Sequence, residues 1–173
     1  TGDALWPSAY APWAAWLTGR TDNQHPGWDP LEFMVAEAHA RKIEFHAWMN
    51  PYRGAEPASV GGPGGDLAKL PADHPLRVHP DWAVVYPNDK ENGRIYFDPG
   101  VPDARRYIED AMLEPVAKYD LDGIHFDDFF YPYPSGSGQE FDDARSFAKY
   151  GKKFASKAEG RDCIRFFSAE LDD

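Results

Sequence analysis

Two adjacent carboxylates, Asp127 and Asp128, are the residues of this sequence best suited to catalysis. They end an alternating stretch, residues 121–126, and an aromatic-rich segment, residues 129–133, follows them directly. A carboxylic acid and a carboxylate can cleave a glycosidic bond, because one protonates the leaving oxygen while the other attacks carbon or activates water. Adjacent side chains of a strand point to opposite faces, so we expect Asp127 to carry the chemistry and Asp128 to orient or tune it.

The second carboxylate of such a pair is expected either at Asp3 or outside this chain. Other side chains near the same segments are candidates to bind a sugar, because aromatic faces in polar loops pack against the C–H faces of sugar rings. The candidate binding residues are Asp3, His46, Trp48, Asn50, Tyr52, Arg53, His125 and Tyr131.

Two alternating stretches are expected to position these residues as β-strands. In the first, the apolar set is Ile43, Phe45, Ala47 and Met49, and the polar set is Glu44, His46, Trp48 and Asn50. In the second, His125 and Asp127 share one parity, while Ile124 and Phe126 share the other. This alternation predicts one face against helices and one polar face, which in a barrel is the lumen, with the active site at the C-terminal strand ends. The alternative is a half-exposed antiparallel sheet whose polar groups are merely solvated.

Helices and a long connection surround the two strands. Asp29 followed by Pro30 predicts a helix start, and that helix is expected to reach residue 41. A second helix is predicted over 102–119, with an apolar stripe that includes Val116 and a kink at Pro115. Further helices are predicted over roughly 140–157 and 161–171. The order of helices and strands favours an α/β fold with parallel strands.

The connection of residues 51–100 is unusually long for a compact domain. It contains a glycine-rich run, residues 61–65, and two strand-like stretches, 82–86 and 94–97, that flank a turn and predict a hairpin. Connections of this length are usually functional lids or disordered segments. We therefore expect the inserted loop and hairpin of 51–100 to act as a mobile cover over the active-site face.

At residues 45–53, FHAWMNPYR, and 121–132, LDGIHFDDFFYP, the chain resembles the bacterial glycosyl-hydrolase-like family 10. Residues 2–8 and 98–100 resemble other segments of the same family. The resemblance implies a (β/α)8 barrel of the TIM type. On this register the chain, residues 1–173, is part of a single catalytic barrel and spans about its third and fourth strands, the flanking helices and the long insertion. A closed barrel usually needs about 250 residues, so a chain of 173 residues is expected to be a fragment that is inactive alone.

The resemblance also implies glycan hydrolysis, at least one branch of the family acting on peptidoglycan strands stripped of their peptides. It implies an exported protein: secreted, periplasmic or an outer-membrane lipoprotein. Two other functions stay open. The barrel could bind glycans without cleaving them, or His46 and His125 could join Asp127 in a metal-dependent hydrolase. We predict no metal and no cofactor, because both histidines are expected to lie below the rim and to form hydrogen bonds within the lumen.

The composition excludes several other classes. The formal net charge of −11 disfavours nucleic acid as a partner, because phosphate binding needs clusters of Lys and Arg. The sequence has no run of about 20 apolar residues, so no transmembrane segment is predicted. A single cysteine, Cys163, excludes an internal disulfide framework and a cysteine-rich zinc site. A polysaccharide partner is what the family resemblance implies, and carboxylates beside aromatic residues at a strand end suit it.

Overall fold

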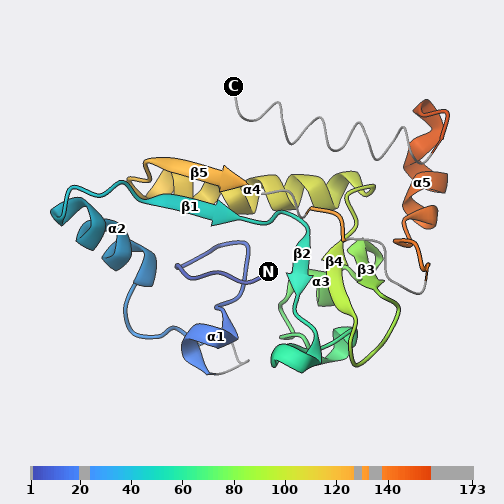
Figure 1. Cartoon of the computed structure of the whole chain (residues 1–173), viewed down its shortest axis with the longest axis horizontal. Coiled ribbons are helices and arrows are strands. Elements are labelled where there is room, and N and C mark those ends of the chain that lie inside the picture. The colour runs from blue at the N-terminus through green and yellow to red at the C-terminus, as the bar shows by residue number, and fades with distance from the viewer. Residues whose placement is uncertain (1, 20–23, 127–129, 133–137, 157–173) are drawn as a thin grey trace.

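A computed structural model describes residues 2–19, 24–126, 130–132 and 138–156 of the chain. Within these ranges the chain forms a mixed α/β structure with one parallel and one antiparallel sheet (Figure 1). The α-helices are α1 (Ala15–Thr18), α2 (Pro30–Ala40), α3 (Pro75–Val78), α4 (Pro102–Lys118) and α5 (Ala144–Tyr150). The strands are β1 (His46–Met49), β2 (Arg53–Ala55), β3 (Ala83–Tyr86), β4 (Arg94–Phe97) and β5 (Gly123–Phe126). Short 3-10 helices are η1 (Ala58–Val60), η2 (Leu67–Lys69), η3 (Pro80–Trp82) and η4 (Gly151–Lys153).

The two alternating stretches form a parallel pair, β1 and β5, as the sequence predicted. Both strands are shorter than predicted. At their beginning, the carboxylate of Asp122 accepts the backbone N–H of Phe45 at 2.7 Å and contacts the His39 ring at 2.8 Å. These side-chain contacts tie the end of α2 to the start of the pair. Figure 1 shows α4, which precedes β5 in the chain, running along one side of the pair.

The predicted hairpin is confirmed. β3 and β4 pair antiparallel, and β2 joins the other edge of β4, which gives the strand order β2-β4-β3. Asp89 organises the turn between β3 and β4, because its carboxylate accepts the backbone N–H groups of Glu91 and Asn92 at 2.8 and 3.2 Å. Aspartate is favoured in turns because it satisfies backbone donors in this way.

α2 begins at the predicted cap. One carboxylate oxygen of Asp29 accepts the backbone N–H groups of Leu31 and Glu32 at 3.0 and 3.1 Å, which satisfies two donors that the helix leaves free. The other oxygen accepts the hydroxyl of Tyr119 at 2.6 Å. The same residue therefore starts α2 and links it to the end of α4.

The predicted apolar stripe of α4 is correct at its start and wrong near its end. Ala104 and Ile108 are buried, whereas Val116 is exposed. Glu114 and Pro115 are buried in its place, because the N-terminal segment packs across this end of the helix. The helix continues through Pro115 to its last residue.

The predicted helix of residues 140–157 is only partly helical. Its central part forms α5 and η4, which begin after the buried Phe141. The Ser146 hydroxyl of α5 donates to the carboxylate of Asp98 at 3.0 Å, and this contact fixes α5 against the turn between β4 and α4. Burial raises the pKa of Asp98. The helix predicted over 161–171 lies outside the described residues.

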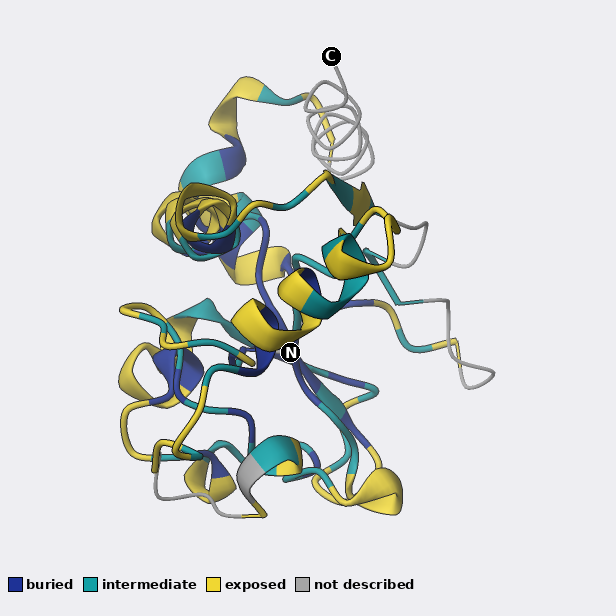
Figure 2. Ribbon diagram, turned by 90° about the vertical axis from the view of Figure 1, so that its left-hand side faces the viewer, coloured by how far each residue is buried: buried dark blue, intermediate teal, exposed yellow. Residues whose placement is uncertain are grey.

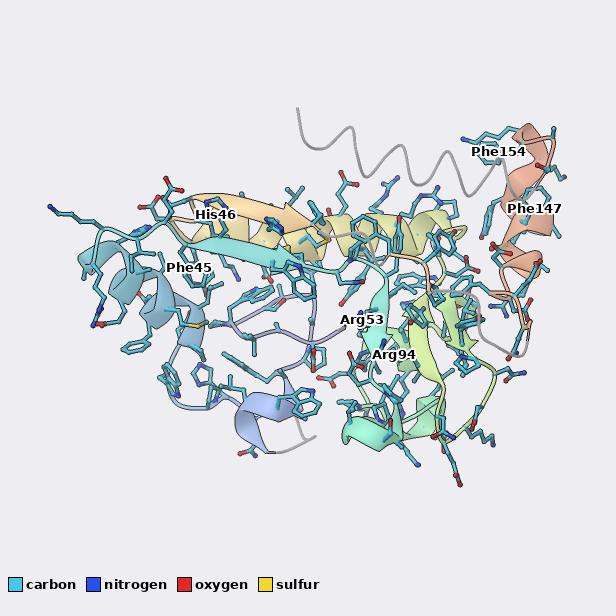
Figure 3. All side chains as sticks on the ribbon, in the orientation of Figure 1. Phe45, His46, Arg53, Arg94, Phe147 and Phe154 are labelled. Carbon is cyan, nitrogen blue, oxygen red and sulfur yellow. The ribbon has the colours of Figure 1, made fainter. Side chains whose placement is uncertain are left out.

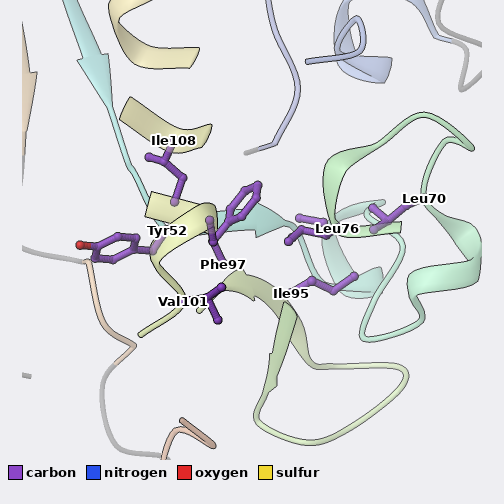
Figure 4. Close-up of a cluster of buried hydrophobic side chains, with 9 residues drawn as sticks. Tyr52, Leu70, Leu76, Ile95, Phe97, Val101 and Ile108 are labelled. Atoms are coloured by element: carbon purple, nitrogen blue, oxygen red, sulfur yellow. The ribbon is translucent and has the colours of Figure 1, made fainter. Parts of the chain in front are cut away.

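The main hydrophobic core lies largely within the long connection (Figure 4). Its nine buried residues are Tyr52, Ala55, Leu70, Leu76, Ile95, Phe97, Val101, Ala104 and Ile108. Figure 2 shows buried residues concentrated where the strands and loops converge and exposed residues along the outer sides of the helices. Six of the nine core residues belong to residues 51–100, so much of this connection is folded into the core. Its predicted role as a mobile cover over an active-site face stays a prediction.

Candidate active site

The register of β1 and β5 brings three of the predicted site residues onto one face. His46 pairs with Gly123, and Trp48 pairs with His125. Paired residues of adjacent strands project to the same side, and His46, Trp48 and His125 are all exposed. We call His46, Trp48, Gly123 and His125 the polar strand face. Figure 3 shows His46 and Phe45 on opposite sides of β1, as the alternation predicted.

A glycine in β5 makes room on the polar strand face for a histidine of β1. A Cβ atom at Gly123 would lie 3.0 Å from Cε1 and Nδ1 of His46, closer than nine in ten such contacts. The ring of His46 therefore lies over the β5 backbone, and its Nε2 is 3.3 Å from a carboxylate oxygen of Glu44. Trp48, in the next position of the same face, is 53% exposed.

The turn after β1 is fixed by a predicted site residue. The amide oxygen of Asn50 accepts the backbone N–H groups of Tyr52 and Arg53 at 3.3 and 3.1 Å. This capping bends the chain away from the strand direction and into β2. Asn50 thus has a structural task in addition to any contact with a ligand.

Four polar residues gather where β1 ends. The backbone N–H of Gly2 donates to the carbonyl of Gly54 at 2.8 Å, which brings the N-terminal segment alongside β2. Asp3, Asn50, Arg53 and Glu56 all line a cleft of about 560 Å³ that also extends between β1 and α4. We call these four residues the rim cluster and this cavity the central cleft. Its volume is typical of small-molecule sites, which span about 300–1,000 Å³.

Glu56 lies between the guanidinium groups of Arg53 and Arg94. Figure 3 labels these two arginines near β2 and β4. Nε of Arg94 donates to one carboxylate oxygen at 2.7 Å, and Nη1 of Arg53 lies 3.6 Å from the other. Only 15% of the Glu56 side chain is exposed. Nε of Arg53 is buried and has no hydrogen-bond partner among the described residues. Arg53 was predicted from the sequence as a binding residue, whereas Glu56, in the same short segment after β1, was not.

Two predicted binding residues pack away from the central cleft. Tyr52 is buried in the main core, and burial raises its pKa to about 12. Its ring lies 6.1 Å from that of Tyr131, which in turn packs edge-on against Phe141 at 5.3 Å. Within the described part of the chain, the lining of the central cleft includes neither tyrosine. Their predicted contact with a ligand stays a prediction.

The two predicted catalytic residues, Asp127 and Asp128, lie outside the described residues. β5 ends at Phe126, so the described strand stops one position before Asp127. Among the described residues, no group of three or more His, Cys, Asp or Glu side chains is placed to share a metal ion. In the same described ranges, no helix has the length and apolar character needed to cross a bilayer.

A buried carboxylate on α4 holds the N-terminal segment that carries Asp3. Glu114 accepts hydrogen bonds from the indole N–H of Trp6 and the backbone N–H of Ala9 at 2.9 and 2.8 Å, and it also accepts from the Ser8 hydroxyl. Nζ of Lys118 donates to it at 2.8 Å. Burial favours the neutral acid, but these donors outweigh burial and lower the pKa of Glu114 to about 2.

The arrangement suits a hydroxyl-rich ligand. Carboxylate and amide oxygens of the rim cluster can accept hydrogen bonds from hydroxyl groups, and Arg53 can donate them. The exposed indole of Trp48 offers an apolar face next to these polar groups. A sugar presents both kinds of surface, so a glycan fits the residues better than a purely apolar molecule.

Comparison with known proteins gives concordant matches. Residues 1–169 match the family described as "Glycosyl hydrolase-like 10". The chain is 47% identical over 152 residues to "Glycosyl hydrolase YngK" of Bacillus subtilis, an alignment that covers 88% of this chain and 27% of that protein. It is 39% identical over 163 residues to "Glycosyl hydrolase DigH" of Escherichia coli, with 92% of this chain and 35% of that protein covered. The chain thus spans about a third or less of the length of these curated relatives.

Proposed function

The chain belongs to the glycosyl hydrolase-like 10 family, and from this premise we propose that the full-length protein carrying it hydrolyses O-glycosidic bonds of a bacterial cell-wall or related polysaccharide. The observation that carries the proposal is the register of β1 and β5. It places Trp48 beside His125 on one exposed face, and the two strands lead directly into Asn50 and the adjacent carboxylates. Glycan cleavage requires a pair of carboxylates, and this face leads to Asp127, a candidate for one of them.

The proposed architecture is a (β/α)8 barrel in which β1 and β5 are the third and fourth strands. Two adjacent parallel strands, a long α4 between them in the chain and a polar face on the pair are consistent with this fold. The polar strand face then lines the lumen, and the rim cluster lies at the C-terminal ends of the strands. In this arrangement the chain alone does not close the barrel, so we expect residues 1–173 by themselves to be inactive.

In the proposed mechanism Asp127 acts as the nucleophile or the acid, and Asp128 orients it. The second catalytic carboxylate is Asp3, which lines the central cleft, or a residue outside this chain. The oxocarbenium-like transition state carries positive charge, which a carboxylate facing the cleft stabilises. The His46 and His125 side chains, exposed on the polar strand face, supply hydrogen bonds to sugar hydroxyls.

The proposed substrate is a peptide-free peptidoglycan strand, and the proposed location is outside the cytoplasm: secreted, periplasmic or an outer-membrane lipoprotein. Support for both comes from the motifs of residues 45–53 and 121–132, which resemble those of the family. The net charge of −11 disfavours an anionic glycan at long range, so a strand with carboxylate groups requires local cations. Arg53 at the rim of the central cleft is the cation placed to serve this purpose.

The test compares Asp127→Asn and Asp128→Asn in the full-length protein, with Asp142→Asn as a matched control at an exposed position. Each variant is assayed for turnover of peptide-free peptidoglycan strands and of neutral glucans, and for thermal stability. We expect Asp127→Asn to lose several orders of magnitude in kcat, at roughly 1.4 kcal/mol of barrier per tenfold. The loss in Asp128→Asn is expected to be smaller, and the control is expected to match wild type.

Near-normal turnover in Asp127→Asn, or a larger loss in Asp128→Asn, would move the catalytic role away from Asp127. If the wild-type protein binds glycans but releases no product from any of them, the result would favour a glycan-binding barrel without catalysis. Activity that disappears with a chelator and returns with added metal would favour the metal-dependent alternative. Robust turnover by residues 1–173 alone would contradict the proposed barrel register.

A further inference from the structure

We propose that a second cavity, beside the rim cluster, is a subsite for an uncharged sugar residue of the glycan chain. This proposal rests on the proposed function and specifies where a part of the substrate away from the cleaved bond binds. The cavity has a volume of about 460 Å³ and lies between α1 and the turn that follows η1. Figure 1 shows these two segments facing each other below the N-terminus. We call this cavity the outer hollow.

Two indole rings from the N-terminal segment line the outer hollow. Trp16 belongs to α1 and is 65% exposed, and Trp13 lies just before that helix. The ring of Trp13 is fixed by an edge-on contact with His25 at 4.9 Å. A large, exposed aromatic side chain in a concave site offers the flat apolar surface on which a sugar ring packs.

Glycines shape the opposite wall of the outer hollow. A Cβ atom at Gly61 would lie 3.9 Å from Cη2 of Trp16, and the φ angle of Gly61 is +83°, a conformation that other residues rarely adopt. A Cβ atom at Gly62 would lie 2.1 Å from the carbonyl oxygen of Glu56, so no side chain fits there. Gly62 thus packs against the backbone of Glu56, and Gly61 places no side chain between this turn and the indole of Trp16.

The charged groups of the outer hollow favour an uncharged ligand. Two carboxylates, Asp3 and Glu56, line it together with one cation, Lys69. Both carboxylates can accept hydrogen bonds from sugar hydroxyls. Asp3 also repels a sugar acid, whereas the charge of Glu56 is offset by Arg53 and Arg94. The hollow also contains His74, but both ring nitrogens of this buried residue face the backbone: Nδ1 accepts the N–H of Leu76 at 3.1 Å, and Nε2 lies towards Gly2 and Gly54.

The outer hollow continues into the candidate active site. Asp3, Trp16 and Glu56 line both the outer hollow and the central cleft. A chain of linked sugars that reaches the rim cluster can therefore extend into the outer hollow without leaving the protein surface. A linear polymer fits two joined cavities of this kind better than a single small molecule does.

The experiment replaces Trp16 by alanine in the full-length protein, with Trp28→Ala as the matched control. Trp28 is similarly exposed, at 48%, and packs against Phe33 outside both cavities. Binding is measured by calorimetry with hexamers of β-1,4-linked N-acetylglucosamine and of β-1,4-linked glucose. We expect Trp16→Ala to weaken binding of the better hexamer roughly three- to tenfold, as the loss of one aromatic contact predicts. The control and Trp16→Phe are expected to stay near wild type.

A kinetic measurement separates this proposal from the proposed function. On a glycan that the wild-type protein cleaves, Trp16→Ala is expected to raise KM for long chains with kcat almost unchanged, and to affect short chains less. An equal loss for short and long chains, or unchanged KM, overturns the subsite while the hydrolase proposal stands. If the protein cleaves no glycan but its glycan binding depends on Trp16, the hydrolase proposal is overturned and the subsite proposal stands.

Two further outcomes concern the ligand itself. If the wild-type protein binds neither of the two uncharged hexamers, the subsite proposal is overturned. Oligogalacturonate of the same length carries a carboxylate on every ring, and we expect it to bind at least tenfold more weakly than the better uncharged hexamer. Equal binding of the acidic oligomer, lost in Trp16→Ala, contradicts the selection for an uncharged sugar.

Discussion

Replacing Glu114 by glutamine removes the charge of the carboxylate that holds the N-terminal segment. In the wild-type protein this side chain accepts hydrogen bonds from Trp6, Ser8 and Ala9 and from the ammonium group of Lys118. All of these partners are donors. The amide NH2 of glutamine is a further donor, so at least one of the four contacts turns from attractive to repulsive.

The magnitude follows from the pKa of Glu114. The difference between its ordinary value of 4.5 and the folded value of about 2 corresponds to about 3 kcal/mol, at about 1.4 kcal/mol per pH unit. Only 5% of the side chain is exposed, so solvent screens these contacts little. Hydrogen bonds to charged groups contribute about 1.5–3 kcal/mol each, and breaking a buried ionic contact typically costs about 3–5 kcal/mol, which agrees with this value. We therefore expect Glu114→Gln to lower the free energy of unfolding by about 3 kcal/mol at pH 7.

The lowered pKa of Glu114 determines in which direction the stability changes with pH. The folded pKa is depressed, so the stabilisation by Glu114 is fully present above the unfolded value of 4.5 and is lost as the pH falls towards 2. The difference in free energy of unfolding between wild type and Glu114→Gln should therefore shrink between pH 5 and pH 3. The assay is urea denaturation of the full-length protein across this range, with Glu109→Gln as a control at an exposed position of the same helix. A difference below about 1 kcal/mol at pH 7, or one that does not change with pH, would refute the reasoning.

Three further predictions concern the core of residues 51–100. Burial lowers the pKa of His74 from 6.5 to about 4, so its contribution favours folding most above pH 6.5. The free energy of unfolding should therefore fall by about 2 kcal/mol between pH 7 and pH 5. Thermal melting should show this pH dependence in the wild-type protein and not in His74→Asn. Gly54→Ala should lower the free energy of unfolding by about 1–3 kcal/mol in urea denaturation, because its Cβ would lie 2.3 Å from Cδ1 of the fully buried Leu76. Deleting residues 57–75 removes Leu70 from the main core, so circular dichroism should show a clear drop in melting temperature. An unchanged melting temperature would support a loosely packed cover instead.

Local patterns predicted those features whose partners are close in the sequence. The alternation over residues 43–50 and 121–127 identified both strands and the face that carries His46, Trp48 and His125. Asp29 marked the start of α2, and the hairpin of β3 and β4 followed from its turn residues. Such features depend on the two-residue period of a strand or on capping within one turn, so neighbouring residues are enough to specify them.

Features that join distant segments required the tertiary structure. Glu56 meets Arg94, which is 38 residues further along the chain, and Glu114 meets Trp6 across 108 residues. The sequence pattern also made the glycine-rich connection resemble a mobile cover, although Leu70 and Leu76 belong to the core. The spacing of residues within one helix or strand does not predict these contacts. They depend on how the connection and the N-terminal segment fold back towards the sheet. The sequence by itself therefore determined which residues share a strand face, and the tertiary structure decided which carboxylates and arginines meet at its end.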